Sequence, residues 1–80
     1  MKEDIKDHLV QYLSDEYPVE IDKKTYLGDI GIDSLDLMNL IAHIENQYSI
    51  KFHNMELLNW KYRTVENLAS TINYKINENS

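Results

Sequence analysis

The apolar positions along the chain fall into three stretches with helical spacing. The first predicts a helix that ends near Ser14 or Asp15. Its apolar face consists of Ile5, Leu9, Tyr12 and Leu13. The second stretch is the most regular, and its apolar positions are Leu37, Leu40, Ile41, Ile44 and Tyr48. The third predicts a helix from about Thr64, with an apolar face of Val65, Leu68, Ala69, Ile72 and Ile76.

A long connection, from about Glu16 to Ile32, joins the first two predicted helices. It holds the only proline of the chain, Pro18, and both glycines, Gly28 and Gly31. A connection of this length without regular structure usually carries function or packs through its own side chains. Four side chains of its second half are expected to attach it to the core: Tyr26, Leu27, Ile30 and Ile32.

The remaining segments are short. Ser49 to Asn54 interrupts the second helix, and Ile50 and Phe52 are its expected buried anchors. We expect a short helix from Met55 to Trp60, and we expect residues 1–2 and 77–80 to fray. No useful length of sequence alternates between apolar and polar residues as a strand does. The chain is therefore predicted to be one all-α domain over residues 1–80, a small bundle of three main helices plus one short helix.

The bulk composition disfavours several classes of function. The 80 residues carry 14 acidic and 8 basic side chains, and this net charge of −6 argues against nucleic acid as a partner. The chain has no cysteine for a disulfide or a zinc–thiolate site, and we expect no metal centre. The polar start and the lack of a long apolar run predict a cytoplasmic protein that does not insert into a membrane. We also expect a monomer, and not an enzyme, because so small a core leaves little room for a walled catalytic pocket.

The start of the second helix offers the clearest chemistry. Asp33 is a preferred N-cap residue, and Asp36 follows it at capping-box spacing. Ser34 then lies on the exposed first turn, where backbone N–H groups lack partners and the helix dipole is positive. A phosphate at Ser34 would therefore lie in a favourable field. A lone Asp-Ser pair would be an ordinary helix cap, so only the surrounding sequence can indicate whether this pair has a function.

The segment Gly31-Ile32-Asp33-Ser34-Leu35 resembles the Gly-x-Asp-Ser-Leu signature of the acyl carrier protein family. The resemblance covers the whole chain, including the long loop and the Thr64-Val65 opening of the last helix. It implies that a phosphopantetheinyl transferase, using coenzyme A and magnesium, attaches 4'-phosphopantetheine to Ser34, with Asp33 and Leu35 flanking the site. A loading enzyme and downstream synthases would then use the arm's thiol to carry acyl, aminoacyl or peptidyl thioesters.

The acidity of the chain is concentrated around this motif. Between Lys24 and Lys51 there is no basic residue, whereas Asp29, Asp33, Asp36 and Glu45 all lie there. Such a cluster can serve solubility alone, but its position favours steering of basic partners. The residues expected to dock partner enzymes are Asp29, Asp36, Met38 and Glu45.

Some positions differ from carriers of fatty-acid synthesis. Asn39 stands where a Glu is common, and His53 stands where many have proline. The stretch from Phe52 to Val65 is slightly longer, and residues 45–48 resemble D-alanyl and other aminoacyl or secondary-metabolism carriers. Fatty-acid, polyketide, aminoacyl and peptidyl cargoes therefore remain open.

Rival functions lack supporting residues. As a hydrolase nucleophile, Ser34 would need a base, and His8, His43 and His53 have no spacing that pairs them with it, so they are expected to be surface or boundary residues. A third reading is a carrier-fold interaction module that is never modified.

The spacing of Asp29, Gly31 and Asp33 is superficially that of a calcium loop, but Leu40 stands where such a loop needs its Glu. Trp60 and Tyr62 are expected to pack at the core and its rim. Exposure of either aromatic residue would instead indicate a partner contact.

Overall fold

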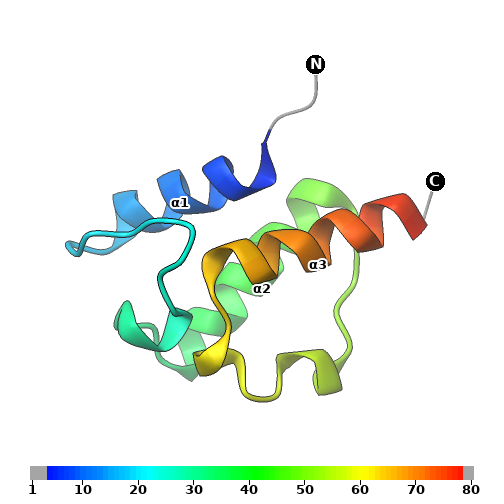
Figure 1. Cartoon of the computed structure of the whole chain (residues 1–80). Coiled ribbons are helices and arrows are strands. Elements are labelled where there is room, and N and C mark those ends of the chain that lie inside the picture. Colours follow the sequence, from blue (N-terminus) through cyan, green and yellow to red (C-terminus); the bar gives the residue numbers. More distant parts are fainter. Residues whose placement is uncertain (1–3, 79–80) are drawn as a thin grey trace.

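The computed structural model describes residues 4–78 (Figure 1). The main elements in that range are three α-helices: α1 (Ile5–Glu16), α2 (Ser34–Tyr48) and α3 (Val65–Glu78). Between them lie three short 3₁₀ helices: η1 (Leu27–Asp29), η2 (Asn54–Leu57) and η3 (Trp60–Tyr62). Across residues 4–78 the structure contains no strand, only an isolated antiparallel bridge between Tyr26 and Thr64. The predicted all-α class is confirmed.

Short polar side chains begin each of the three α-helices. The Asp4 carboxylate accepts the Lys6 N–H at 3.0 Å at the start of α1. The Thr64 hydroxyl accepts the Asn67 N–H at 3.1 Å at the start of α3. Each satisfies an N–H group that has no partner inside its helix, which is why the helices begin at these positions.

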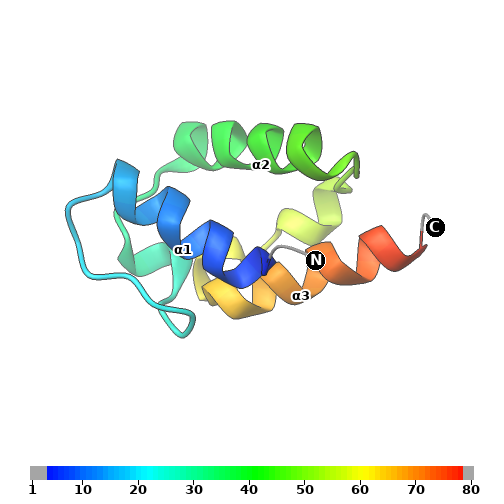
Figure 2. The same ribbon diagram turned by 90° about the horizontal axis from the view of Figure 1, so that it is seen from above.

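The three α-helices surround one core. Figure 2 shows α2 running opposite to α1, while α3 runs in the same sense as α2; α1 packs directly against α3. Three residues of α1, four of α2 and four of α3 are buried. None of the helices formed by residues 4–78 combines the length and the apolar composition needed to cross a membrane.

The long loop between α1 and α2 is held by the core and by the start of α3. Its buried side chains are Ile21, Leu27, Ile30 and Ile32. Its backbone also bonds the segment that opens α3. The Leu27 N–H donates to the Arg63 carbonyl at 2.8 Å, and the Glu66 N–H donates to the Lys23 carbonyl at 2.8 Å. The loop that leads to Ser34 is therefore a packed part of the fold.

Several details differ from the sequence-based expectations. Helix α1 continues to Glu16. The single short helix expected from Met55 to Trp60 is instead two 3₁₀ helices separated by Leu58 and Asn59, and the φ of Asn59 is 58°. Tyr26, expected to help attach the loop, is 50% exposed. Residues 77–78, expected to fray, form the end of α3. Residues 1–2 and 79–80, which were also expected to fray, lie outside the described range.

Candidate functional site

Ser34 is the first residue of α2, and its side chain is exposed. The Asp33 carboxylate caps the helix by accepting the Asp36 N–H at 2.8 Å, and the Asp33 carbonyl accepts the Leu37 N–H at 2.9 Å. The N–H groups of Ser34 and Leu35 come before the first intrahelical bond, so they remain at the positive end of the helix dipole. The structure thus confirms the predicted cap and leaves the serine hydroxyl accessible beside donors suited to an anion.

Gly31 lies in the turn three residues before Ser34. Its φ is 102°, a conformation that residues with a Cβ rarely adopt. A Cβ built on Gly31 would have no atom within 4 Å, apart from the neighbouring residues of the chain. Glycine is therefore required at this position by backbone conformation and not by crowding. The positive φ of Gly31 allows the tight turn that brings the chain into α2.

Tyr17, the half-buried residue that caps the end of α1, interacts with Asp36 on the first turn of α2. Its pKa is raised above the ordinary 10.0 first by burial and then by Asp36, whose carboxylate repels a phenolate and accepts the phenol's hydrogen bond. Asp33 and Glu16 add to this effect. The first turn of α2 is therefore an acidic environment that the end of α1 contacts directly.

The expected docking residues lie along one helix and the loop before it. Met38 is 56% exposed and Leu35 is 71% exposed, so the first turns of α2 present apolar as well as acidic side chains to solvent. Asp29 is exposed on η1. Glu45 lies roughly 16 Å further along α2 than Ser34. One of its carboxylate oxygens accepts the Phe52 N–H at 2.9 Å, a structural bond that the sequence pattern did not indicate.

A hollow of about 520 Å³ lies between η1 and η3. Tyr26 and Tyr62 line it, together with Gly28, Asp29 and Lys61. Tyr62 is 78% exposed, so the expectation that it packs at the rim of the core is wrong. Trp60, in contrast, is half-buried and packs against the core as expected. Asp29 connects this hollow to the loop that leads into Ser34.

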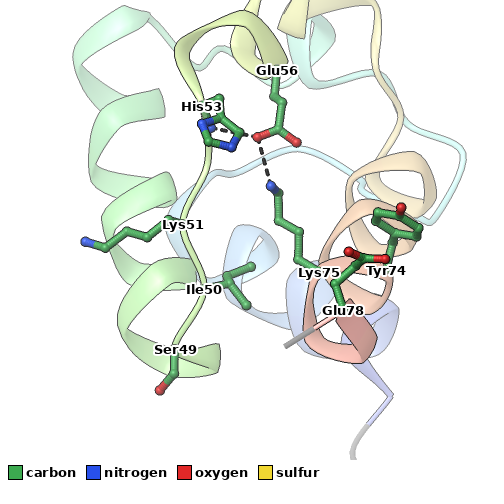
Figure 3. A pocket seen from close by; sticks show the side chains of 8 residues that line it. All are labelled: Ser49, Ile50, Lys51, His53, Glu56, Tyr74, Lys75 and Glu78. Carbon is green, nitrogen blue, oxygen red and sulfur yellow. Dashed lines mark hydrogen bonds and ion pairs between the residues drawn. The ribbon is translucent and has the colours of Figure 1, made fainter. Parts of the chain in front are cut away.

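A second hollow, of about 490 Å³, does not include Ser34 (Figure 3). It lies between the α2–η2 connection and the last turns of α3, and its lining includes His53, Glu56 and Lys75. The Lys75 ammonium is 2.8 Å from Oε1 of Glu56, which also accepts the His53 backbone N–H at 2.6 Å. Burial favours the neutral form of Glu56, but these two partners outweigh it and lower the pKa of the carboxyl. This group of charges fixes η2 to α3.

The three histidines take separate positions. His8 of α1 and His43 of α2 meet, with their Nε2 atoms 3.3 Å apart, while His53 is exposed near η2. His43 lies nine residues beyond Ser34, roughly 13 Å along the axis of α2. Among residues 4–78 no three His, Asp or Glu side chains gather as a metal site. Within the described range, none of the three histidines is therefore placed beside the Ser34 hydroxyl as a catalytic base.

Comparison with known proteins identifies the family. The profile described as "Phosphopantetheine attachment site" matches residues 7–72, which span α1, the loop, α2 and most of α3. The chain is also 35% identical over 57 residues to the "Acyl carrier protein homolog" of Mycoplasmopsis pulmonis (strain UAB CTIP). That match covers 71% of this chain and 78% of the relative. No solved structure matches the chain.

The geometry at the start of α2 fits the group that this family carries. An attached phosphate needs an exposed hydroxyl and nearby donors, and the first turn of α2 offers the Ser34 side chain and two N–H groups without intrahelical acceptors. The chain belongs to the acyl carrier protein family, whose members are carriers without catalytic activity and bear their cargo on a covalent 4'-phosphopantetheine.

Proposed function

We propose that Ser34 is the attachment residue and that this chain delivers acyl intermediates, as thioesters on its 4'-phosphopantetheine, to enzymes of fatty-acid or secondary-metabolite biosynthesis. The observation that carries the proposal is the exposed Ser34 hydroxyl on the first turn of α2, immediately after the Asp33 cap. The matched region includes this position. The family, the exposed hydroxyl and the anion-favouring end of the helix all support the same residue.

The attachment step asks little of the chain's own residues. In the site of a phosphopantetheinyl transferase, the Ser34 oxygen would form a bond to the pantetheine-bearing phosphorus of coenzyme A. The hydroxyl proton would leave to a base of the transferase, and the nucleotide part of coenzyme A would depart. Magnesium and the catalytic base belong to that enzyme. This chain contributes an exposed nucleophile and a positive helix end that favours the product's phosphodiester.

We further propose that partner enzymes dock on the surface around Ser34. Asp29 and Asp36 would attract basic side chains, and Met38 would supply apolar contact. Glu45 would mark the far end of this face, with one oxygen already used by the Phe52 N–H. The exposed Tyr62 beside Asp29 supports extending the face across η1 to η3, because exposed aromatic residues are enriched at protein interfaces.

An aminoacyl cargo is the second candidate. The segment from Phe52 to Val65, which is longer than in carriers of fatty-acid synthesis, forms two 3₁₀ helices and presents Tyr62 to solvent. This feature supports a role closer to D-alanyl or other aminoacyl and peptidyl carriers. Offering the modified protein to adenylating enzymes and to acyl-transferring enzymes would separate the two cargo classes, because only the matching class forms a thioester.

The test of the main proposal is direct. The protein is incubated with coenzyme A, magnesium and a broad-specificity phosphopantetheinyl transferase, and its mass is measured. We expect a gain of one phosphopantetheine in the wild type and none in Ser34→Ala. Ser70→Ala, at an exposed serine of α3, is the matched control and should gain the same mass as the wild type. No gain in the wild type would favour an unmodified interaction module, and a gain that survives Ser34→Ala would place the arm elsewhere.

A further inference from the structure

His8 and His43 form a contact that the carrier function does not use. They are 35 residues apart in sequence, one on α1 and one on α2, and their Nε2 atoms lie 3.3 Å apart in a partly buried position. The two ring planes differ by only 16°, and the ring centroids are 5.6 Å apart, so the rings meet edge to edge. One Nε2 therefore donates a hydrogen and the other accepts it.

Neighbouring tyrosines hold both rings in place. Tyr12 stacks on His43, with centroids 4.2 Å apart and planes 12° from parallel. Tyr48 meets His8 edge to face, with centroids 6.0 Å apart. Aromatic contacts of this kind restrict how a ring can turn. The two Nε2 atoms therefore face each other because of the fold and not by chance rotation of exposed side chains.

The nitrogen separation is that of two ligands on one metal ion. Two imidazole nitrogens bound at about 2.0–2.1 Å to a tetrahedral zinc ion lie about 3.3 Å apart. We propose that His8 and His43 form a two-histidine site for a divalent transition-metal ion, with Zn²⁺ as the reference ion, that joins α1 to α2. No local spacing along the chain indicates such a site, because its two ligands meet only through the packing of the helices.

Metal binding requires the proton between the two rings to move. Both Nε2 lone pairs must point at the ion, so the hydrogen now shared between the rings has to leave that position. In a neutral pair, the ring that carried it takes up a proton on Nδ1 instead, and no net proton is released.

The site differs from a closed structural zinc centre. Among residues 4–78 no third His, Asp or Glu joins the pair, whereas a closed structural zinc centre has four protein ligands. The ion would lie to one side of the line joining the two nitrogens, so each ring would have to turn by roughly 35° within its plane to point its lone pair at the ion. His43 can do this while it stays stacked on Tyr12. Such an ion would staple the N-terminal helix to α2, at a distance from Ser34.

Thermal unfolding of the full chain with increasing Zn²⁺ tests the proposal. We expect Tm to rise with metal concentration, by on the order of 5 °C at a tenfold excess over Kd. His8→Gln and His43→Gln should each lose the rise. His53→Gln is the matched control, since His53 is exposed and outside the pair, and it should keep the rise. Mg²⁺ should have no effect because it prefers oxygen ligands.

A measurement on the wild type guards against variants that fail to fold. Titration with paramagnetic Ni²⁺ should broaden the imidazole resonances of His8 and His43 at lower metal concentrations than those of His53. Broadening of all three histidines together would overturn the proposal. So would the absence of any zinc-dependent rise in Tm, or a rise that persists in both His8→Gln and His43→Gln.

Discussion

A Cβ atom on Gly28 would lie 2.8 Å from the carbonyl oxygen of Lys61 and 2.9 Å from the Cβ of Lys61. The loop before Ser34 therefore touches η3 closely, with no space for a methyl group on Gly28. We predict that Gly28→Ala lowers the free energy of unfolding by about 1–3 kcal/mol, because η1 and η3 must move apart. Urea denaturation would measure the change.

The control for this substitution is Asp29→Ala, which changes the next residue of η1 but adds no atom to the contact. Its effect on the free energy of unfolding should stay within about 0.5 kcal/mol. If Gly28→Ala were as mild as Asp29→Ala, the close contact between η1 and η3 would have no energetic weight.

The acidic first turn of α2 should steer the modifying enzyme. We predict that Asp36→Lys slows phosphopantetheine transfer to Ser34 by about tenfold, because it reverses the charge that partners approach. Added salt should slow the wild type in the same direction, since it screens exposed charges. Initial rates from mass spectrometry would measure both effects. Asp15→Lys makes the same charge change on α1, and this variant should be modified at a rate close to that of the wild type. Equal slowing in both variants would show that the acidic residues serve solubility and not docking.

Tyr17 predicts a pH dependence at the alkaline end. Its folded-state pKa is raised, so the stability that it contributes is complete below the ordinary pKa of 10.0 and is lost as the pH rises through the higher folded value. The wild type should therefore be more stable than Tyr17→Phe near neutral pH, by about 1 kcal/mol, and this difference should shrink above pH 10. Denaturant unfolding of both proteins at several pH values would show it. A difference that stayed constant through that range would contradict the contact between Tyr17 and Asp36.

Glu56 should make the free energy of unfolding depend on pH in the acidic range, with the opposite sign to Tyr17. Its folded-state pKa is lowered, so its contribution is present above the ordinary value of 4.5 and is lost as the pH falls through the lower folded value. We expect Glu56→Gln to cost about 1 kcal/mol at neutral pH, through the bond to Lys75, and nothing at strongly acidic pH. Unfolding free energies at both pH values would measure the change. Glu20→Gln, at an exposed position of the loop, should cost little at either pH.

Local signals in the sequence predicted the three main helices and the Asp33 cap before Ser34 well. The cap at Asp33 and the apolar face of α2 depend on neighbours within one or two helical turns, so their pattern is visible along the chain. The close contact of Gly28 with Lys61 and the meeting of His8 with His43 join residues far apart in sequence. No local spacing encodes such pairs. Tyr26 and Tyr62 were likewise not predictable from local pattern. An aromatic residue is expected in the core from its type alone, and only the fold shows whether its side chain faces the core or the solvent.

The backbone bonds from residues 23–27 to residues 63–66 have a consequence for folding order. They join positions about forty residues apart. The loop before Ser34 can therefore become rigid only after residues 63–66 have reached it, which costs the entropy of closing the roughly forty-residue segment between them. A newly made chain that still lacks its last helix would therefore hold the serine on an unanchored segment. A transferase that recognises the finished surface would then act as a checkpoint and load only carriers that have completed folding.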